Sequence, residues 1–328
     1  MFTISLMLST FIVISSNSWF SAWIGLEINL LSMIPLMHQK KNMYSSEASI
    51  KYFITQAMAS SILLLMIILM MHLSLNLNSN MLMMIMNSAI LMKMGTAPFH
   101  FWFPEVMEGL NWNNCFIMLT WQKIAPMILI MYNINMIEFF SYIIIMCMII
   151  SGIQGINQIS MRKILTYSSI NHIGWMIASM FYIETMWWYY FIIYMLITLN
   201  LTYMFKILNI FYIKQLIMML NNKILIKFFF MMNFLSLGGL PPFMGFFPKW
   251  LTIQNLIFSN NIMLPLMMTF LTLMTLFYYM QLIFSSLILN LSTLNFYLTN
   301  PNINNNMILF NFIMLMSLIF STMMFNWL

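Results

Sequence analysis

Four ionisable residues lie inside long apolar stretches and are the first candidates for chemistry. They are Glu27, Lys93, Lys123 and Lys249. A charge at the centre of a lipid-spanning helix costs on the order of 3 kcal/mol by insertion scales, so such a residue normally faces a partner or a wetted cavity. Removal from water favours a neutral lysine, whereas a nearby carboxylate favours the ammonium form. A lysine between these influences can take up and release a proton, so the four residues predict a proton path.

The order of these charges suggests how a proton event is passed along. If Glu27 pairs with Lys93, breaking or making that pair changes the electrostatic field at Lys123. A structural ion pair is the alternative role for Glu27, and capping of free carbonyls is the alternative for Lys249. Hydroxyl groups that can carry protons between the charges belong to Thr96, Thr120, Ser168 and Ser169.

Two histidines are weaker candidates for the same path. His172 follows Ser168 and Ser169 in the segment YSSINHIGW, where a relay competes with a packing role. His100 lies beside Trp102 in a Pro-containing segment, where a relay competes with an interfacial position. Nearer a span end, Glu47 and Lys51 have the i, i+4 spacing of a helix-stabilising pair.

The composition indicates an integral membrane protein built from helices. Hydrophobic residues make up 62% of the 328 residues, charged residues 5%, and the mean hydropathy is +0.90. These values exclude an ordinary soluble domain. The apolar runs at 57–71 and 262–289 are long enough to cross a bilayer as helices and lack the alternation of barrel strands.

The apolar pattern predicts about eleven transmembrane helices in a single domain over residues 1–328. The expected spans are 2–17, 19–38, 48–72, 81–103, 113–132, 137–156, 164–181, 186–208, 224–257, 262–289 and 306–326. The longest polar connections are 206–223 and 290–306, and neither is long enough for a soluble domain.

The positions of the basic residues predict the orientation, because Lys and Arg near span ends collect on the inner side. Loops after even-numbered spans carry Lys40, Lys41, Arg162, Lys163, Lys206, Lys214, Lys223 and Lys227. Loops after odd-numbered spans carry no Lys or Arg. The N-terminus is therefore expected inside and the C-terminus outside.

Two of the predicted spans are interrupted, and both contain lysines from the path. The fourth has Gly95 and Pro98 after Lys93, and the ninth has a Gly- and Pro-rich stretch before Lys249. Proline frees helix carbonyls, which in a membrane marks a polar cavity. Five-span spacing between the breaks predicts two five-helix units related by inversion, at about 1–134 and 135–290, with a C-terminal helix at about 306–326.

Several other functions lack the residues they need. The net charge of +6 is spread over several loops instead of forming a basic patch with interleaved aromatics, so no nucleic acid is expected. Four scattered histidines do not make a convincing haem pair, and no Gly-rich nucleotide loop follows a strand. Cys115 and Cys147 have no metal-ligand spacing and are interpreted as packing residues.

Several segments resemble one known family. They are WIGLEINLLSMIP (23–35), EASIKYFITQAMAS (47–60), LMKMGTAPFHFWFPEV (91–106), LTWQKIAP (119–126), NQISMRKILTYSSINHIGWM (157–176) and SLGGLPPFMGFFPKW (236–250). They resemble subunit 2 of mitochondrial NADH:ubiquinone oxidoreductase, respiratory complex I, in an insect-like form. The resemblance covers most of the chain and weakens before residue 19 and after about residue 285.

The resemblance implies an antiporter-like, proton-translocating subunit of the complex's membrane arm in the mitochondrial inner membrane. It implies a matrix-side N-terminus, an intermembrane-space C-terminus, and contacts with subunits 4L and 4 and with phospholipids. Family positions for the Glu–Lys pair match Glu27 and Lys93, that of the central lysine matches Lys123, and that of the lysine in the second broken helix matches Lys249. NADH, FMN, iron–sulfur clusters and ubiquinone are implied for other subunits, with no cofactor bound by this chain.

Two other functions remain open from the residues. A stand-alone cation/proton antiporter uses the same broken-helix logic, although a mid-membrane Asp or a pair of acids would be expected to hold Na⁺, and the chain contains no Asp. A scaffold that anchors partner subunits is the second alternative, but it does not need three deep lysines.

Overall fold

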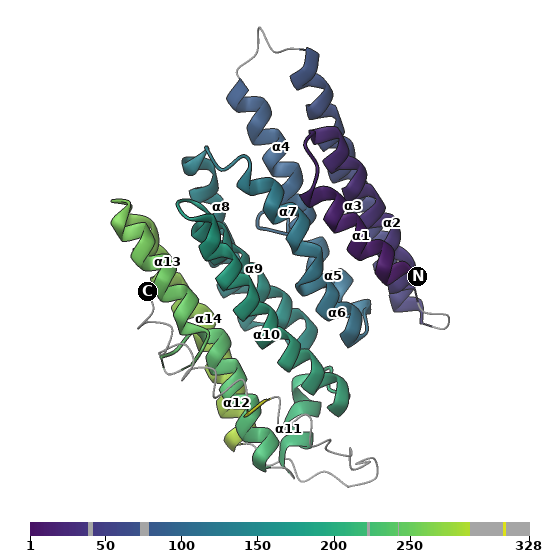
Figure 1. The fold of residues 1–328 in the computed structure, drawn as a ribbon. Coiled ribbons are helices and arrows are strands. Elements are labelled where there is room, and N and C mark those ends of the chain that lie inside the picture. The colour runs from purple at the N-terminus through teal and green to yellow at the C-terminus, as the bar shows by residue number, and fades with distance from the viewer. Residues whose placement is uncertain (39–41, 73–78, 222–223, 242, 289–310, 313–328) are drawn as a thin grey trace. The chain divides into compact units, whose positions relative to one another are not determined.

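The computed structural model describes residues 1–38, 42–72, 79–221, 224–241, 243–288 and 311–312. Nearly all of the described chain is helical (Figure 1). In chain order the helices are α1 (Phe2–Ile14), α2 (Trp19–Met37), α3 (Met43–His72), α4 (Ser79–Met94), α5 (Trp102–Gly109), α6 (Trp112–Leu119), α7 (Trp121–Met131), α8 (Ile137–Ile156), α9 (Met161–Met180), α10 (Glu184–Leu208), α11 (Ile213–Asn221), α12 (Ile224–Gly238), α13 (Phe246–Phe258) and α14 (Met263–Ile288). This agrees with the predicted all-α class.

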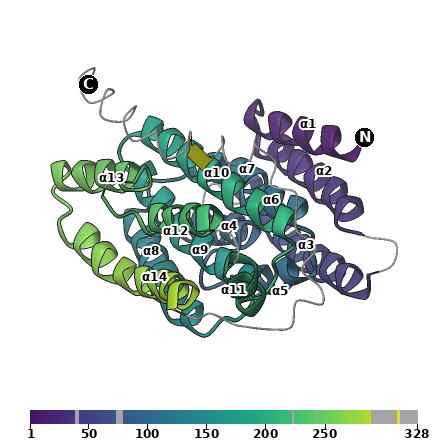
Figure 2. The ribbon, with the colours of Figure 1, turned by 90° about the horizontal axis from the view of Figure 1, so that it is seen from below.

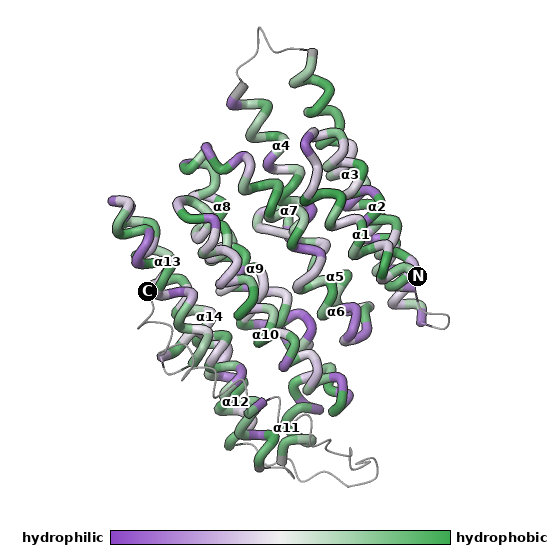
Figure 3. The backbone as a smooth tube through the Cα atoms, in the orientation of Figure 1, coloured by the Kyte–Doolittle hydropathy of each residue, from purple (hydrophilic) through white to green (hydrophobic). Residues whose placement is uncertain are grey.

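Several helices have the length and composition of membrane spans. Within the described residues, six stretches meet both criteria: Trp19–Met37, Met43–Met71, Trp112–Met131, Ile137–Ile156, Glu184–Leu208 and Met263–Ile288. The Trp112–Met131 stretch combines α6 and α7. Shorter apolar helices cover Phe2–Ile14, Asn80–Met94 and Leu225–Gly238. Figure 3 shows hydrophobic residues along most of these helices, with hydrophilic residues mainly at their ends and in a few interior turns. Helices that are apolar on their outward faces suit a lipid environment.

The chain divides into two compact units, Met1–Met146 and Cys147–Leu328, with the division inside α8. In the first unit, α2 packs against α1 and α3, while α4 packs against α3 and α7 (Figure 1). The Lys123–Ile130 segment of α7 is buried on every side. This helix therefore forms the core of its unit.

The second unit is built around α9, which contacts α10, α13 and α14 (Figure 2). Every residue from Ile164 to Met180 is buried, although the segment includes serine, asparagine and histidine. A helix with polar residues enclosed in this way must satisfy them inside the protein. The polar side chains of α9 are consequently candidates for function.

Interruptions occur in both helices that the sequence predicted to be broken. In the first unit α4 ends at Met94 and α5 begins at Trp102, with Gly95 at φ +72° between them. In the second unit α12 ends at Gly238 and α13 begins at Phe246, and Gly239 has φ +76°. Positive φ suits glycine because it has no Cβ.

A third interruption was not predicted. Residues 113–132 were expected to form one helix, but α6 ends at Leu119 and α7 begins at Trp121. Thr120, between them, has φ −119° and ψ −73°, and its hydroxyl donates to the Phe116 carbonyl at 2.7 Å. Side-chain bonds of this type compete locally with the regular helix pattern. The break lies less than one turn before Lys123.

One further difference concerns a connection. The 206–223 connection was expected to be polar, but it contains α11, whose Leu216, Ile217 and Leu220 are buried. Burial of one apolar face stabilises such a short helix. The expected 290–306 connection lies outside the described residues, as does the expected helix 306–326 except for residues 311–312.

Candidate functional site

Lys249 lies in the first turn of α13 and reaches back across the break to α12. Its Nζ donates to the Gly238 carbonyl at 2.8 Å and to the Leu237 carbonyl at 3.4 Å. The last carbonyls of a helix have no partner within it and carry the negative end of the helix dipole. They are therefore suitable acceptors for an ammonium group, and Lys249, only 6% exposed, has access to them without water.

The conformation of Gly239 leaves room for this lysine. A Cβ atom at Gly239 would lie 2.7 Å from Lys249 Cδ and 2.8 Å from Nζ, closer than non-bonded atoms approach. The ring of Trp175, on α9, lies 5.8 Å from Nζ and supplies a cation–π contact. The break in α12–α13 thus provides both the space and the acceptors for a charged side chain.

Lys123 has comparable burial in the first unit, where it is 1% exposed. It lies in the first turn of α7, directly after the Thr120 interruption, and its backbone amide donates to the Thr120 carbonyl at 3.1 Å. Its Nζ lies 5.6 Å from the centre of the Phe103 ring on α5. The first atom of that side chain, Phe103 Cβ, is 3.0 Å from the position of a Cβ on Gly95, so the α4–α5 break sets the ring's position.

Lys93 lies in the last turn of α4 and is 7% exposed. The turn is held from outside, because the Gln56 amide donates to the Lys93 carbonyl at 3.2 Å and the Trp102 indole donates to the Met92 carbonyl at 3.2 Å. These two bonds supply donors to carbonyls in the last turn of α4, and the Met92 carbonyl also accepts from the Gly95 amide at 3.1 Å. All three lysines are therefore buried beside an interrupted helix.

Glu27 is half-buried on α2, beside a groove of about 540 Å³ that Trp23, Ser60 and Leu64 also line. Its carboxylate interacts electrostatically with Lys93. No ion pair joins them among the residues that the structure describes, so the contact supposed from the sequence is a longer-range interaction here.

The two histidines have different surroundings. His172, on α9 and 4% exposed, has its Nδ1 at 2.9 Å from the Tyr190 hydroxyl on α10. His100, 1% exposed in the α4–α5 break, donates from Nδ1 to the Pro98 carbonyl at 3.2 Å, and its ring packs on Phe101. His100 therefore helps to satisfy the interrupted backbone, and His172 faces another group that can exchange a proton.

The four hydroxyls expected to bridge the charges bond to carbonyls nearby in the sequence. Thr96 donates to Leu91, Thr120 to Phe116, Ser168 to Leu165 and Ser169 to Thr166. Each oxygen still has a lone pair with which to accept a proton donor.

Several side-chain hydrogen bonds made by Asn and Gln were missed by the sequence analysis. In the first unit Gln122 donates to Asn29 at 3.0 Å and Asn133 donates to Asn87 at 3.3 Å. In the second unit Asn171 donates to Thr275 at 3.2 Å. The sequence feature that could have predicted them is the presence of isolated Asn and Gln residues within apolar spans, because such side chains commonly form hydrogen bonds between membrane helices.

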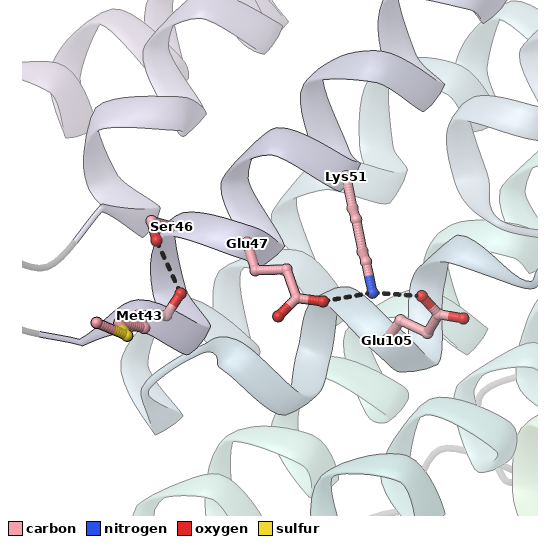
Figure 4. Close-up of polar contacts among 5 residues, drawn as sticks. All are labelled: Met43, Ser46, Glu47, Lys51 and Glu105. Carbon is pink, nitrogen blue, oxygen red and sulfur yellow. Dashed lines mark hydrogen bonds and ion pairs between the residues drawn. The ribbon is translucent and has the colours of Figure 1, made fainter.

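A charged cluster joins α3 to α5 in the first unit (Figure 4). Lys51 Nζ lies 2.9 Å from Glu47 and 2.8 Å from Glu105. The sequence predicted the i, i+4 pair with Glu47 and missed Glu105, which is distant in the chain. All three side chains are exposed, so solvent weakens both pairs.

No group of three or more His, Cys, Asp or Glu residues that could hold a metal ion is found in the described part of the chain. Cys115 and Cys147 are both buried, consistent with packing.

Comparison with known proteins identifies the family. A family model described as NADH:quinone oxidoreductase/Mrp antiporter, TM, matches residues 16–275. The NADH-ubiquinone oxidoreductase chain 2 of Aedes aegypti is 53% identical over 331 residues, which cover 99% of this chain and 97% of that protein. The chain belongs to the NADH-ubiquinone oxidoreductase chain 2 family. The family member from Locusta migratoria is 44% identical and covers 93% of this chain and 89% of its own.

Solved structures show the same fold at low sequence identity. A chain of respiratory complex I from Thermus thermophilus with bound aureothin has a TM-score of 0.85 at 19% identity, covering 98% of this chain and 78% of its own. A chain of the Mrp complex from Dietzia sp. has a TM-score of 0.77 at 15% identity, covering 89% of this chain and 61% of its own. The fold is therefore shared by respiratory and Mrp complexes.

The space around Lys249 generates a prediction for Gly239→Ala. The added Cβ would displace the lysine stem, and a left-handed backbone costs a non-glycine residue about 1–2 kcal/mol. We expect lower thermal stability of the solubilised protein, and a density map in which Nζ has left the Gly238 carbonyl.

Gly238→Ala is the matched control, because its Cβ would make ordinary contacts with Tyr279 at 3.6 Å and Leu276 at 3.7 Å. It should leave both stability and the Lys249 contact unchanged. Equal behaviour of the two variants would show that Gly239 does not shape the lysine site.

Proposed function

We propose that this chain is a proton-translocating core subunit of the membrane arm of respiratory complex I. It would couple NADH oxidation and ubiquinone reduction, carried out in other chains, to proton movement through Glu27, Lys93, Lys123 and Lys249. The main observation in support is that three lysines are buried in apolar helices and that each lies beside a helix interruption. The names and extensive identity of the relatives support the assignment to this complex.

The arrangement at Lys249 suggests how a lysine can hold a proton and then release it. In the ammonium form, Nζ donates to the terminal carbonyls of α12. Loss of the proton removes the charge that the helix dipole stabilises, while the remaining N–H groups can still donate. A change in nearby charge then shifts the balance between the two forms.

Lys93 and Lys123 would continue the path in the first unit. The carboxylate of Glu27 acts on Lys93 through space, without a direct ion pair. Proton movement between side chains at this separation requires intervening water or hydroxyl groups, as in other buried relays. His172 extends the path in the second unit, and His100 is the less favoured relay because its Nδ1 is bonded to a backbone carbonyl.

The same proposal includes the architecture of eleven spans, with five-helix inverted repeats at about 1–134 and 135–290 and a C-terminal helix at about 306–326. Interruptions between α4 and α5 and between α12 and α13 support it, as does the separation into two compact units. Discontinuous helices in inverted repeats are a feature of transporter folds.

We place the protein in the mitochondrial inner membrane, with the N-terminus on the matrix side and the C-terminus facing the intermembrane space. The distribution of Lys and Arg supports this orientation. Subunits 4L and 4 and phospholipids are the proposed neighbours. NADH, FMN, iron–sulfur clusters and ubiquinone would be used in other subunits, with no redox centre in this chain.

A stand-alone cation/proton antiporter is the second candidate function, favoured by the fold shared with the Mrp complex. Native-gel separation of mildly solubilised membranes distinguishes the two. Co-migration of this chain with NADH dehydrogenase activity supports the respiratory assignment. Migration in a small band without that activity, together with sodium-dependent flux by the isolated chain, supports the antiporter.

Lys123→Met tests the proton path in the assembled complex. Methionine retains much of the side-chain volume but carries no proton, so we expect transfer through this subunit to slow by roughly 100-fold or more. The measurement is the number of protons translocated per NADH oxidised in sealed vesicles.

The control is Lys214→Met, the same replacement at an exposed lysine of α11. It should assemble and pump normally. An assembled Lys123→Met complex that translocates as many protons per NADH as the unmodified complex would contradict the proposed path.

A further inference from the structure

We infer that Tyr190 is the positioning residue for His172 and that the two form a reversible proton-carrying pair in the second unit. The inference rests on the proposed proton path and adds a residue to it. It follows from one geometry: the Tyr190 hydroxyl lies 2.9 Å from His172 Nδ1, and the two side chains come from adjacent helices, α10 and α9.

The pair is enclosed by protein. Tyr190 is 1% exposed and His172 is 4% exposed. The ring of Tyr194, one turn further along α10, lies 5.0 Å from the imidazole and covers it. In an interior of low dielectric constant a hydrogen bond of this kind is strengthened, and its loss is correspondingly costly. Tyr190 therefore fixes the orientation of the imidazole.

The hydrogen bond also determines where the imidazole carries its proton. When the phenol O–H donates to Nδ1, the neutral ring must carry its hydrogen on Nε2. When the ring is protonated at both nitrogens, Nδ1–H donates to the phenol oxygen, and the phenol hydrogen turns to another acceptor. The bond can thus exist in both directions without movement of either helix.

Proton transfer through the pair balances with a proton donor on the Tyr190 side and a proton acceptor on the Nε2 side of His172. A proton arrives at Tyr190 Oη as the original O–H bond breaks and an N–H bond forms at His172 Nδ1. His172 then releases the Nε2 proton to the next acceptor. Tyr190 is neutral before and after the step, and one proton has moved past the pair. The imidazole hydrogen has moved from Nε2 to Nδ1, so the ring must return to its first tautomer before the next proton passes in the same direction.

Other buried hydroxyl groups occur in the second unit. Tyr194 and Tyr279 are buried there, and the Tyr194 ring packs on the His172 imidazole at 5.0 Å. The Tyr194 hydroxyl interacts with Ser169. This set of hydroxyls offers both donors and acceptors within the second unit.

The pair is also close to the proposed lysine path along α9. His172 and Trp175 are three residues apart, so they lie on the same helix face about one turn from each other. Lys249 Nζ lies over the Trp175 ring at 5.8 Å. His172 therefore lies about one helical turn along α9 from the residue that contacts Lys249, with Tyr190 at its Nδ1.

The test is Tyr190→Phe in the assembled complex. Phenylalanine keeps the ring and removes only the hydroxyl, so packing is preserved. Loss of one hydrogen bond of about 1.4 kcal/mol changes a rate constant about tenfold. We therefore expect proton translocation through the subunit to slow by about that factor. The readout is the initial rate of NADH-driven proton uptake into sealed vesicles at matched amounts of assembled complex.

Tyr189→Phe is the matched control, since it is the neighbouring tyrosine on α10 and is 50% exposed. It should behave as the unmodified chain. A His172→Gln variant and the double variant add a second readout: if the two groups act as one pair, the double variant is no slower than the slower single variant. Additive losses, or unmodified rates in Tyr190→Phe, overturn the inference.

If Tyr190→Phe does not assemble, Tyr190→Trp replaces it. The indole N–H can donate to Nδ1 but cannot accept a proton from it. Slowed proton uptake by that assembled variant supports the reversible pair, and an unmodified rate overturns it.

Failure of this inference is separable from failure of the proposed function. If Lys123→Met slows translocation but Tyr190→Phe does not, the lysine path stands without Tyr190. If neither slows it, both the path and the pair are overturned.

Discussion

The fold depends on one constraint: a lysine buried in an apolar helix must find polar atoms, and an intact helix offers few. Ending the helix supplies them, because its last carbonyls lack partners. Lys249 shows this directly by donating to the Gly238 and Leu237 carbonyls. The glycines and prolines of the interrupted segments therefore have two roles: they redirect the backbone, and they make polar atoms available to the buried lysines. Gly239 connects the two roles, since its positive φ turns the chain and its missing Cβ leaves space for the lysine.

The two units satisfy this constraint with different groups. In the first, the end of α4 is bonded by Gln56 and Trp102, and Lys123 lies over Phe103. In the second, the lysine itself bonds to the end of α12, and polar groups gather on the fully buried α9. Each unit thus combines an interrupted helix with a buried one: α4–α5 with α7 in the first unit, and α12–α13 with α9 in the second. Buried charges or hydroxyls occur where these helices meet.

Much of this organisation could be predicted because it is encoded locally. Lys93 and Lys249 were recognised as buried because their neighbours in the sequence are apolar, and the adjacent Gly and Pro residues indicated the breaks. What could not be predicted depends on contacts between distant segments. The bond between His172 and Tyr190 and that between Lys51 and Glu105 are of this kind. The interruption at Thr120 has no adjacent glycine, so the local sequence gave only a weak signal. Glu27 and Lys93 were identified from the sequence and considered as a pair, but their separation depends on how α2 and α4 each pack against α3.

The central claim is that the lysines exchange protons and do not merely cap carbonyls. Lys249→Arg separates these roles, since arginine keeps the positive charge and donors but does not release its proton in proteins. The measurement is protons translocated per NADH oxidised by the assembled complex. The account predicts assembly with NADH oxidation retained and fewer protons translocated. Translocation equal to that of the unmodified complex would contradict it and leave Lys249 as a structural cap.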